Sequence, residues 1–217
     1  MTRLAVFDLD GTLVDSAPDI HAALDRLALA RGLAPYGRAE VVAMIGDGVR
    51  VLVERALVAR GQGFSNAALE AFTADYTAHA VDQTALFDGM AATLAALEGQ
   101  GWRLAVCTNK PAAATAALLE RLGLGGRFAA VGAGDSFPVK KPNPEHLRAT
   151  IAAATGRRER AVMIGDHRND VMAARGLGVP VVFARWGYGA LAMAEGAAAQ
   201  AHSPAELPDL LNMILAA

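Results

Sequence analysis

Short apolar runs recur along the chain and are separated by longer stretches of helical periodicity. Each run ends at a turn signal or a polar cluster, which is typical of a strand buried in a sheet. The pattern predicts five strands: Leu4–Phe7, Leu104–Cys107, Phe128–Val131, Ala161–Ile164 and Val179–Phe183.

Helical patterns lie between the later runs. One opens after Pro111 and reaches Leu122-Gly123, a second runs from Pro144 to Thr155-Gly156, and a third spans about Asp170 to Arg175 before Gly176. Proline near a helix start and glycine just past its end are common boundary signals. Strands that alternate with helices indicate βαβ units, and so we expect an α/β fold built on a parallel sheet.

The segment between the first two predicted strands has a different pattern. From about Asp15 to Asp82 it shows helical spacing only, in three stretches separated by glycine-containing breaks: Pro18–Ala30, Ala39–Arg60 and Ala67–Ala80. We expect an all-helical insertion over 15–82, most simply a four-helix bundle, on an α/β core of 1–14 and 83–217. Its connections would be Asp15–Pro18 and Gln83–Gly89, so that it forms a cap hinged over the strand edge.

Composition narrows the function classes. The chain has 217 residues with 20 basic and 22 acidic side chains, which is no basic field of the kind that nucleic-acid binding needs. No apolar stretch has the length of a membrane span, and Met1-Thr2-Arg3 leads directly into a strand, unlike a secretory signal. The single cysteine, Cys107, fits a reducing cytoplasm. We expect a cytoplasmic protein with a small-molecule ligand, as a monomer or a homodimer.

Acidic residues follow the first predicted strand. Asp8 and Asp10 stand in Asp-Leu-Asp-Gly-Thr, directly after Phe7. In open α/β sheets ligands bind at the carboxyl ends of the strands. One carboxylate at this edge is a candidate nucleophile or metal ligand, and a second one two positions later is a candidate acid/base. Taken alone, Asp-Gly is more often a simple surface turn.

Polar residues at two later strand ends could bind phosphate. Thr108 follows the second strand and precedes a helix, and a hydroxyl beside free helix N–H groups makes a phosphate seat, although a plain helix cap is as good an interpretation. Asn109 could share that seat. Lys141 lies in a loop stiffened by Pro142 and Pro144, where it could pair with a phosphate and with the nucleophile's carboxylate.

Two further acids close the fourth strand. Asp166 would meet Asp8 across the strand edge, and Asp170 lies one helical turn later, where a helix start is the alternative explanation. Two like charges ~4 Å apart repel by ~4 kcal/mol at an effective dielectric constant near 20. Several such pairs require a cation, and hard oxygen ligands beside a phosphate select Mg²⁺.

The ordered set of these residues resembles the four motifs of the haloacid dehalogenase superfamily of phosphatases. The motifs are Asp8-Leu-Asp10-Gly-Thr, Thr108, Lys141 and Gly165-Asp166 with Asp170, and the resemblance covers essentially the whole chain. Within the superfamily the sequence looks most like the phosphoglycolate phosphatases. Five short motifs carry that likeness: Asp15-Ser16-Ala17-Pro18-Asp19, Ile45-Gly46-Asp47-Gly48, Thr108-Asn109-Lys110, Lys141-Pro142-Asn143-Pro144 and Trp186-Gly187-Tyr188-Gly189.

The resemblance implies a doubly wound, Rossmann-like parallel sheet with a helical cap, and a role for each motif residue. Asp8 would attack phosphorus and form an aspartyl-phosphate, while Asp10 would protonate the leaving oxygen and then activate water. Asp8, the backbone carbonyl of Asp10, and Asp166 would hold Mg²⁺. Thr108 and Lys141 would bind phosphoryl oxygens. Asp170 would not bind the phosphate itself; it would orient Lys141 or a metal-bound water.

Three other residues have less certain places. Arg50 in the cap is a candidate partner for a substrate carboxylate, although an exposed helix arginine is the commoner fate. Tyr188 is a similar case, since an aromatic residue near a site mouth is more often packing. His167 departs from the family pattern, in which Ser or Thr usually follows this Gly-Asp. It would touch the metal's water shell or point to solvent.

Other functions stay open within the same chemistry. The substrate could be 2-phosphoglycolate, a sugar phosphate or a nucleotide, and a phosphomutase would carry the same acid pair. A non-enzymatic receiver module also uses an acidic Mg²⁺ site, a phosphorylated Asp, a Thr and a Lys on a doubly wound sheet. The Asp-x-Asp pair, the helical insertion and the length argue against a receiver.

Overall fold

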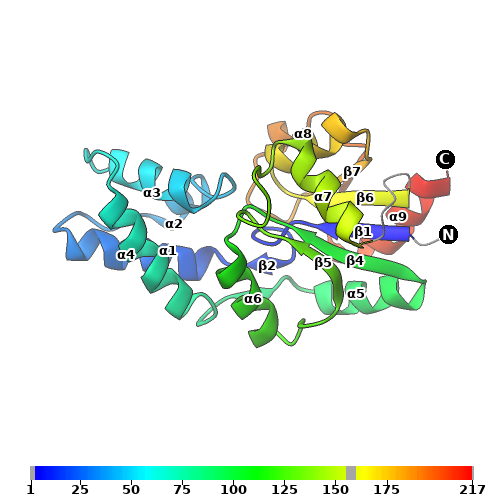
Figure 1. The fold of residues 1–217 in the computed structure, drawn as a ribbon, viewed down its shortest axis with the longest axis horizontal. Coiled ribbons are helices and arrows are strands. Elements are labelled where there is room, and N and C mark those ends of the chain that lie inside the picture. The colour runs from blue at the N-terminus through cyan, green and yellow to red at the C-terminus, as the bar shows by residue number, and fades with distance from the viewer. Residues whose placement is uncertain (1–2, 155–159, 217) are drawn as a thin grey trace.

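The computed structural model describes residues 3–154 and 160–216 and has a parallel six-stranded sheet at its centre (Figure 1). The strand order is β5-β4-β1-β6-β7-β8. These strands span Phe128–Gly132, Trp102–Cys107, Arg3–Phe7, Ala161–Gly165, Val181–Ala184 and Ala199–Ala201, respectively. The five predicted strands are confirmed; β8 was not predicted, because Ala-Gln-Ala carries little apolar signal.

Helices cover both faces of the sheet, as a doubly wound fold requires. One face packs against α5 (Met90–Gly99), α6 (Ala112–Arg121) and α9 (Leu207–Ala216). The opposite face packs against α7 (Pro144–Ala154) and α8 (Arg168–Leu177). Figure 1 shows α7 and α8 on one side of the sheet and α5 and α6 on the other. The predicted α/β, Rossmann-like fold class is confirmed.

The strand β1 shows why the sheet lies at the centre. Its neighbours are β4 and β6, and Leu4, Ala5, Val6 and Phe7 are all completely buried. Alternate residues point into the two apolar clusters, with Ala5 and Phe7 on one face and Leu4 and Val6 on the other. A strand that is apolar on both sides can only lie inside a two-sided layer. Its carboxyl end therefore occupies a fixed position from which Asp8 emerges.

The helix boundaries differ from the prediction in places. Helix α8 begins at Arg168 and ends before Gly178, which has a φ of 71° and forms the C-cap, so the predicted end at Gly176 was wrong. The predicted end of α7 at Thr155-Gly156 lies outside the described residues. Helices α5 and α9 were not predicted; α5 is apolar on most sides and gives no amphipathic signal.

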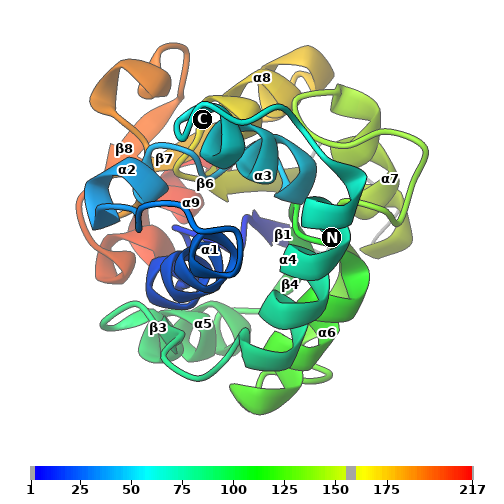
Figure 2. The same ribbon diagram turned by 90° about the vertical axis from the view of Figure 1, so that its left-hand side faces the viewer.

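Residues between β1 and the sheet's second strand form a separate group of helices. These are α1 (Ala17–Ala30), α2 (Arg38–Val42), α3 (Val49–Val58) and α4 (Asn66–His79). They enclose their own apolar cluster, which includes Leu24, Val53, Leu57 and Phe72. Figure 2, viewed from this side, shows the four helices in front of the sheet. We propose that 15–82 form a cap unit and 1–14 with 83–217 the core.

The predicted helix over Ala39–Arg60 is broken in two. Gly46 and Gly48 have φ values of 121° and 88° between α2 and α3. Residues that carry a side chain rarely adopt such φ values, and an α-helix cannot continue through them. The break produces a loop, Ile45–Gly48, that faces the core.

The cap is joined to the core at a short antiparallel ribbon. Strand β2 (Val14–Asp15) pairs with β3 (Ala85–Leu86), so the two connecting segments run side by side. The buried carboxylate of Asp19 accepts hydrogen bonds from the backbone N–H groups of Gln83 and Thr84 and from the Thr84 hydroxyl. This contact ties the start of α1 to the chain that returns to the core.

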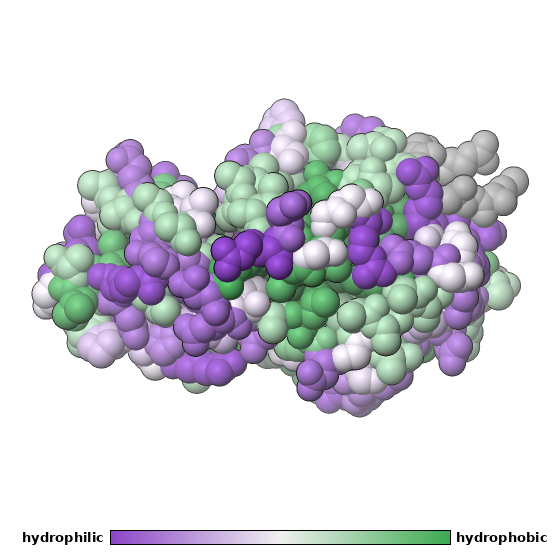
Figure 3. Space-filling model, turned by 90° about the horizontal axis from the view of Figure 1, so that it is seen from below, coloured by the Kyte–Doolittle hydropathy of each residue, from purple (hydrophilic) through white to green (hydrophobic). Residues whose placement is uncertain are grey.

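The molecular surface is mixed in character. Figure 3 shows polar and apolar residues interspersed over the cap and the core, with a notch between the two lobes. Within the described residues, no helix is both long enough and apolar enough to cross a bilayer.

Candidate active site between core and cap

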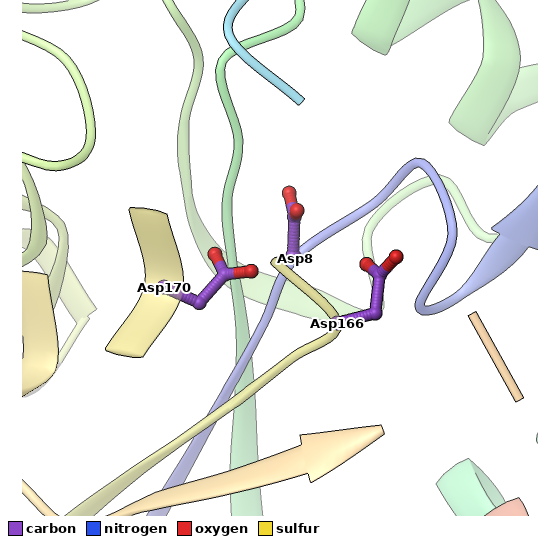
Figure 4. Close-up of side chains that lie close together, drawn as sticks. All are labelled: Asp8, Asp166 and Asp170. Atoms are coloured by element: carbon purple, nitrogen blue, oxygen red, sulfur yellow. The ribbon is translucent and has the colours of Figure 1, made fainter. Parts of the chain in front are cut away.

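Strands β1 and β6 bring two of the predicted acids together. Asp8 directly follows β1 and Asp166 directly follows β6, and the Asp8 N–H donates to the Ile164 carbonyl at 2.8 Å. Oxygens of Asp8, Asp166 and Asp170 all lie within 4.8 Å of one another (Figure 4). All three residues are buried. The prediction that these acids converge on one strand edge is confirmed.

Glycine permits this close approach. A Cβ at Gly165 would lie 2.2 Å from Asp170 Cγ, and a Cβ at Gly187 would lie 2.3 Å from the Asp166 Cβ. Real Cβ atoms do not approach other atoms so closely. These two glycines therefore let the acidic side chains occupy space that any other residue would fill.

Lys141 lies in the loop between β5 and α7 and reaches the same acids. Its Nζ is 2.8 Å from Asp8 Oδ1 and 2.6 Å from Asp170 Oδ1, and its side chain is 1% exposed. Burial alone would lower the pKa of the ammonium, but the Asp170 and Asp8 carboxylates outweigh that effect and raise it. Lys141 therefore stays charged at any physiological pH.

The three carboxylates are held in different ways. Asp170 uses both oxygens within the protein: Oδ1 pairs with Lys141, and Oδ2 accepts the His167 N–H at 3.0 Å at the start of α8. Asp8 Oδ1 accepts the Leu9 N–H at 2.7 Å and pairs with Lys141. Among the described residues, Asp8 Oδ2 has no hydrogen-bond partner. This oxygen is the one available for chemistry.

Asp166 is oriented by neutral donors. Its Oδ1 accepts the Thr12 hydroxyl at 2.8 Å, and its Oδ2 accepts the backbone N–H groups of Tyr188 and Gly189 at 2.8 and 3.3 Å. Tyr188 also reaches the cap connection, where its hydroxyl donates to Asp15 Oδ1 at 2.7 Å and accepts the Ala17 N–H at 2.9 Å. Tyr188 thus links the acid cluster to the cap connection.

The electrostatics of the cluster show a deficit of positive charge. Burial, with repulsion from Asp8 and Asp170, raises the pKa of Asp166 to about 7. Burial raises the pKa of Asp8 to about 6, although Lys141 opposes the shift. Three buried acids thus share one ammonium. A hard divalent cation would supply the missing charge, and carboxylate oxygens at this spacing are the ligands that Mg²⁺ prefers, so the residues fit such an ion.

Thr108 is buried at the end of β4, but it is not seated at a helix N-terminus. Helix α6 begins only at Ala112, whose N–H donates to Asp135 Oδ1 at 2.7 Å. The Thr108 hydroxyl accepts the Lys110 N–H at 3.1 Å and faces the pocket beside Asp8. The N-cap of α6 is Pro111, so the plain helix-cap interpretation of Thr108 was wrong, and its phosphate contact stays a prediction. The hydroxyl itself remains available to a phosphoryl oxygen.

The Asn109 side chain joins two loops. Its Nδ2 donates to the Gly46 carbonyl of the cap at 3.0 Å and to the Lys141 carbonyl at 2.9 Å. Both amide hydrogens are therefore engaged, and the side chain fixes the Lys141 loop against the cap. Asn109 also lines the pocket, and its contact to a phosphate stays a prediction.

Asp10 lies beside a second buried lysine, Lys110, to which the sequence analysis assigned no role. Lys110 Nζ is 3.0 Å from Asp10 Oδ1, and Ser16 Oγ donates to the same oxygen at 2.6 Å. Lys110 also donates to the hydroxyl of Tyr76 on α4 of the cap. The available signal was a lysine in a strand-end loop, the same kind of position that singled out Lys141.

A pocket opens above these acids between core and cap. Its core wall includes Asp8, Asp10, Thr108 and Lys110, and its cap wall is largely apolar, with Ile20, Leu52 and Phe72 among its residues. Arg50 is not part of this pocket. Its side chain is exposed on α3 with the guanidinium 4.2 Å from the centre of the Phe64 ring. The Arg50 hypothesis was therefore wrong for this conformation, because the helical turn directs the side chain outward.

The Ile45–Gly48 loop rests directly on the core. Asn169 Nδ2 donates to Asp47 Oδ1 at 2.7 Å, and Lys140 Nζ donates to the Asp47 carbonyl at 2.6 Å. His167 lies beneath the loop, since a Cβ at Gly46 would be 2.7 Å from its ring. The His167 Nδ1 also accepts the Asn169 N–H at 3.3 Å. His167 therefore caps α8 and supports the loop, a role that neither earlier alternative described.

The sequence is similar to those of known proteins along most of its length. Residues 5–184 match the model of a family described as haloacid dehalogenase-like hydrolase. The sequence is 39% identical over 199 residues to a phosphoglycolate phosphatase of Agrobacterium fabrum, covering 90% of this chain and 85% of the relative. It is 40% identical over 228 residues to a phosphoglycolate phosphatase of Cereibacter sphaeroides, covering 97% of this chain and 98% of the relative.

Solved structures resemble the whole fold. A predicted phosphoglycolate phosphatase from Haemophilus somnus superposes with a TM-score of 0.88 at 27% identity, covering 96% of this chain and 97% of that one. CbbY from Rhodobacter sphaeroides, in complex with phosphate, gives a TM-score of 0.82 at 26% identity, covering 95% of this chain and 96% of that one. The likeness to these two structures therefore extends over both the cap and the core.

Proposed function

The chain belongs to the haloacid dehalogenase-like hydrolases and is a phosphoric monoester hydrolase, and on that premise we propose that it hydrolyses 2-phosphoglycolate through an aspartyl-phosphate on Asp8. Membership of this hydrolase family excludes the receiver-module alternative. The observation that carries the proposal is the cluster of Asp8, Asp166 and Asp170 around Lys141, with Asp10 at the pocket.

Asp8 is the nucleophile in this proposal. Its Oδ1 is held by Lys141 and the Leu9 N–H, which leaves Oδ2 to attack phosphorus in line with the ester oxygen. Attack forms the Oδ2–P bond while the P–O bond to the leaving group breaks. Water then attacks the same phosphorus, which releases phosphate and restores the carboxylate.

Asp10 moves the proton in both steps. It donates a proton to the leaving oxygen in the first step and accepts one from water in the second. Ser16 Oγ and Lys110 Nζ fix its carboxylate from two sides, at 2.6 and 3.0 Å from Oδ1. A side chain so restrained can serve a leaving oxygen and a water at the same position.

The other site residues bind and orient. Lys141 and the Thr108 hydroxyl would neutralise and hold the transferring phosphoryl oxygens, and Asp170 positions Lys141. Asp8, Asp166 and the backbone carbonyl of Asp10 would hold Mg²⁺. When bound, the ion supplies positive charge to the phosphoryl group and to the acids.

The choice of 2-phosphoglycolate rests on the relatives and on the pocket. Curated relatives about 40% identical carry that substrate in their names. The pocket lies beneath a cap that closes onto the core through Asp47 and Asn169, and such a closed space suits a small ester from which water must be excluded. We also propose that the protein acts in the cytoplasm.

The test is a panel of phosphate monoesters with detection of released phosphate in the presence of Mg²⁺. We expect 2-phosphoglycolate to give the highest kcat/KM. A hexose phosphate at the top of the ranking would overturn the substrate assignment, and absence of phosphate release from every ester would overturn the hydrolase itself.

A sugar phosphate is the second candidate. A CbbY structure from Rhodobacter sphaeroides that holds xylulose-1,5-bisphosphate superposes on this chain with a TM-score of 0.80 at 25% identity. The panel therefore includes pentose and hexose phosphates, with chromatography of the products. An isomeric sugar phosphate formed in place of free phosphate would identify a phosphomutase.

A further inference from the structure

Lys110 is a buried cation in the pocket that holds Asp10 but has no substrate contact in the proposed phosphoryl-transfer steps. Its side chain is 3% exposed, and it is the only positively charged residue among those that line the pocket. Lys141, by contrast, lies beneath Asp8 and Asp170. A buried ammonium is costly unless it is paired, so its presence in this wall needs an explanation.

The donors of Lys110 are not all engaged. An ammonium has three N–H donors. Asp10 takes one of them, with Oδ1 at 3.0 Å and Oδ2 at 3.4 Å, and the Tyr76 hydroxyl takes another. Within residues 3–154 and 160–216 no third acceptor contacts Nζ. Lys141 also has two acceptors, but both are carboxylates, whereas Lys110 pairs with a single carboxylate.

The position of Lys110 relative to Asp10 defines what a third acceptor would be. A group that protonates the leaving oxygen must lie within a hydrogen bond of it, at about 3 Å. The Lys110 ammonium lies at 3.0 Å from the same Asp10 carboxylate. In 2-phosphoglycolate the carboxylate is attached to the carbon that bears the leaving oxygen. A carboxylate on that carbon is therefore within reach of Nζ.

The cap side completes the contact. Tyr76 belongs to α4 and holds the ammonium from above, with Nζ 4.5 Å from the ring centre. The remaining cap wall includes the apolar Ile20, Leu52 and Phe72, together with Thr73 and Thr77, whose hydroxyls donate to backbone carbonyls of α4. Lys110 is thus fixed by one residue from the core and one from the cap, and it is in place when the two meet.

We propose that Lys110 is the specificity-determining residue that binds the carboxylate of the substrate, and that Tyr76 is a positioning residue that holds its ammonium in place. The inference rests on the proposed function, because it places the leaving oxygen at Asp10. It assigns selection between esters to Lys110, whereas the bond-breaking step stays with Asp8 and Asp10.

The experiment compares three esters on wild type and Lys110→Met. The esters are 2-phosphoglycolate, its analogue 2-hydroxyethyl phosphate, in which a neutral hydroxymethyl group replaces the carboxylate, and p-nitrophenyl phosphate, whose leaving group needs no proton. For wild type we expect kcat/KM to favour 2-phosphoglycolate over 2-hydroxyethyl phosphate by about 10²-fold. In Lys110→Met we expect kcat/KM for 2-phosphoglycolate to fall by about 10²-fold or more, with changes below about tenfold for the other two.

Each alternative role of Lys110 predicts a different pattern of kcat/KM across the three esters. Equal losses on the two alkyl esters, with p-nitrophenyl phosphate spared, would mean that Lys110 only positions Asp10 and would overturn the inference. Unchanged selectivity in Lys110→Met would overturn it as well. A wild type without preference for the carboxylate would overturn both the inference and the assigned substrate, while leaving the hydrolase intact.

Two further variants guard against loss of folding. Lys110→Arg keeps the charge, and we expect it to retain most of the selectivity; selectivity as low as in Lys110→Met would contradict the role of the cation. Lys140→Met is the matched control, since Lys140 is a half-buried lysine that contacts the Asp47 carbonyl outside the pocket. We expect it to change all three esters alike. The melting temperature of each variant is measured alongside.

A binding measurement separates recognition from rate. The non-hydrolysable 3-phosphonopropionate carries both charges of 2-phosphoglycolate, whereas ethylphosphonate lacks the carboxylate. We expect Lys110→Met to weaken inhibition by 3-phosphonopropionate by about 10²-fold and inhibition by ethylphosphonate by less than about threefold. Parallel weakening of both inhibitors would contradict a contact to the carboxylate.

Discussion

The core wall and the cap wall of the pocket are built from opposite kinds of side chain. The core wall carries charges that are buried, paired and fixed near strand ends, such as Asp8 and Lys110. The cap wall is apolar around Ile20 and Phe72, and it contacts the core through the Tyr76 hydroxyl and the Ile45–Gly48 loop. On the proposals above, the core performs the chemistry, and Lys110, held between core and cap by Asp10 and Tyr76, controls which ester is accepted.

The largest loss of activity is expected from a substitution of Asp8 on the core wall. Asp8→Asn keeps the shape of the side chain but removes the nucleophile, and we expect kcat to fall by at least ~10⁴-fold for every ester. Because the change also removes a buried negative charge, the melting temperature should stay within a few degrees of wild type. Residual turnover near one tenth of wild type would exclude Asp8 as the nucleophile.

Asp10→Asn tests the second core acid. We expect a loss of ~10²–10⁴-fold in kcat for alkyl esters, the usual contribution of general acid/base catalysis. The loss in the first step should be much smaller for p-nitrophenyl phosphate, whose leaving group departs as an anion, and burst kinetics would measure that step. Full activity of the variant on 2-phosphoglycolate would remove the role assigned to Asp10.

Removal of the metal should expose the repulsion within the core cluster. The raised pKa values of Asp8, about 6, and Asp166, about 7, mean that the folded protein binds protons more tightly than the unfolded chain. Stability of the metal-free protein should therefore fall as the pH rises from about 4 to about 7. We expect a melting temperature several degrees lower at pH 8 than at pH 5, and chelation should also abolish activity.

Mg²⁺ should reverse that dependence. The ion binds ionised carboxylates, so it should raise the melting temperature more at pH 8 than at pH 5. A matched scan of Asp166→Asn should lose most of the response to the ion. A metal-free melting temperature that rises steadily from pH 5 to pH 8 would contradict the arrangement of the acids.

A smaller effect is expected where the cap touches the core. Asn169→Ala removes the hydrogen bond to Asp47 Oδ1 and the weaker bond to the Gly46 carbonyl. Losing them should favour the open cap and raise KM by about tenfold, with a smaller change in kcat. A loss confined to kcat would instead place Asn169 in the chemistry of the core.

The smallest effect is expected at Arg50. Its guanidinium rests on Phe64 outside the pocket, so Arg50→Ala should change kcat/KM for every ester by less than about twofold. A selective loss on 2-phosphoglycolate would show that Arg50 turns into the pocket when substrate binds, and would move the carboxylate contact from Lys110 to the cap.

Much of the core could be predicted from the sequence, because local patterns determine it. A buried strand followed by a carboxylate places Asp8 and Asp166 at the same sheet edge whatever the cap does. The contact between Lys110 and Tyr76 could not be predicted in the same way, since it joins two residues from different units and depends on how the cap sits. Gly46 and Gly48 were visible signals of a helix break that the apolar spacing concealed.

Capture of the phosphorylated enzyme tests the central claim most directly. The enzyme is mixed with ³²P-labelled 2-phosphoglycolate and Mg²⁺, quenched in acid within milliseconds, digested and analysed by mass spectrometry. The account predicts a hydroxylamine-sensitive phosphoryl group on the peptide that contains Asp8, formed before phosphate release and absent from Asp8→Asn. Rapid turnover with no label on that peptide, or a label on another residue, would contradict it.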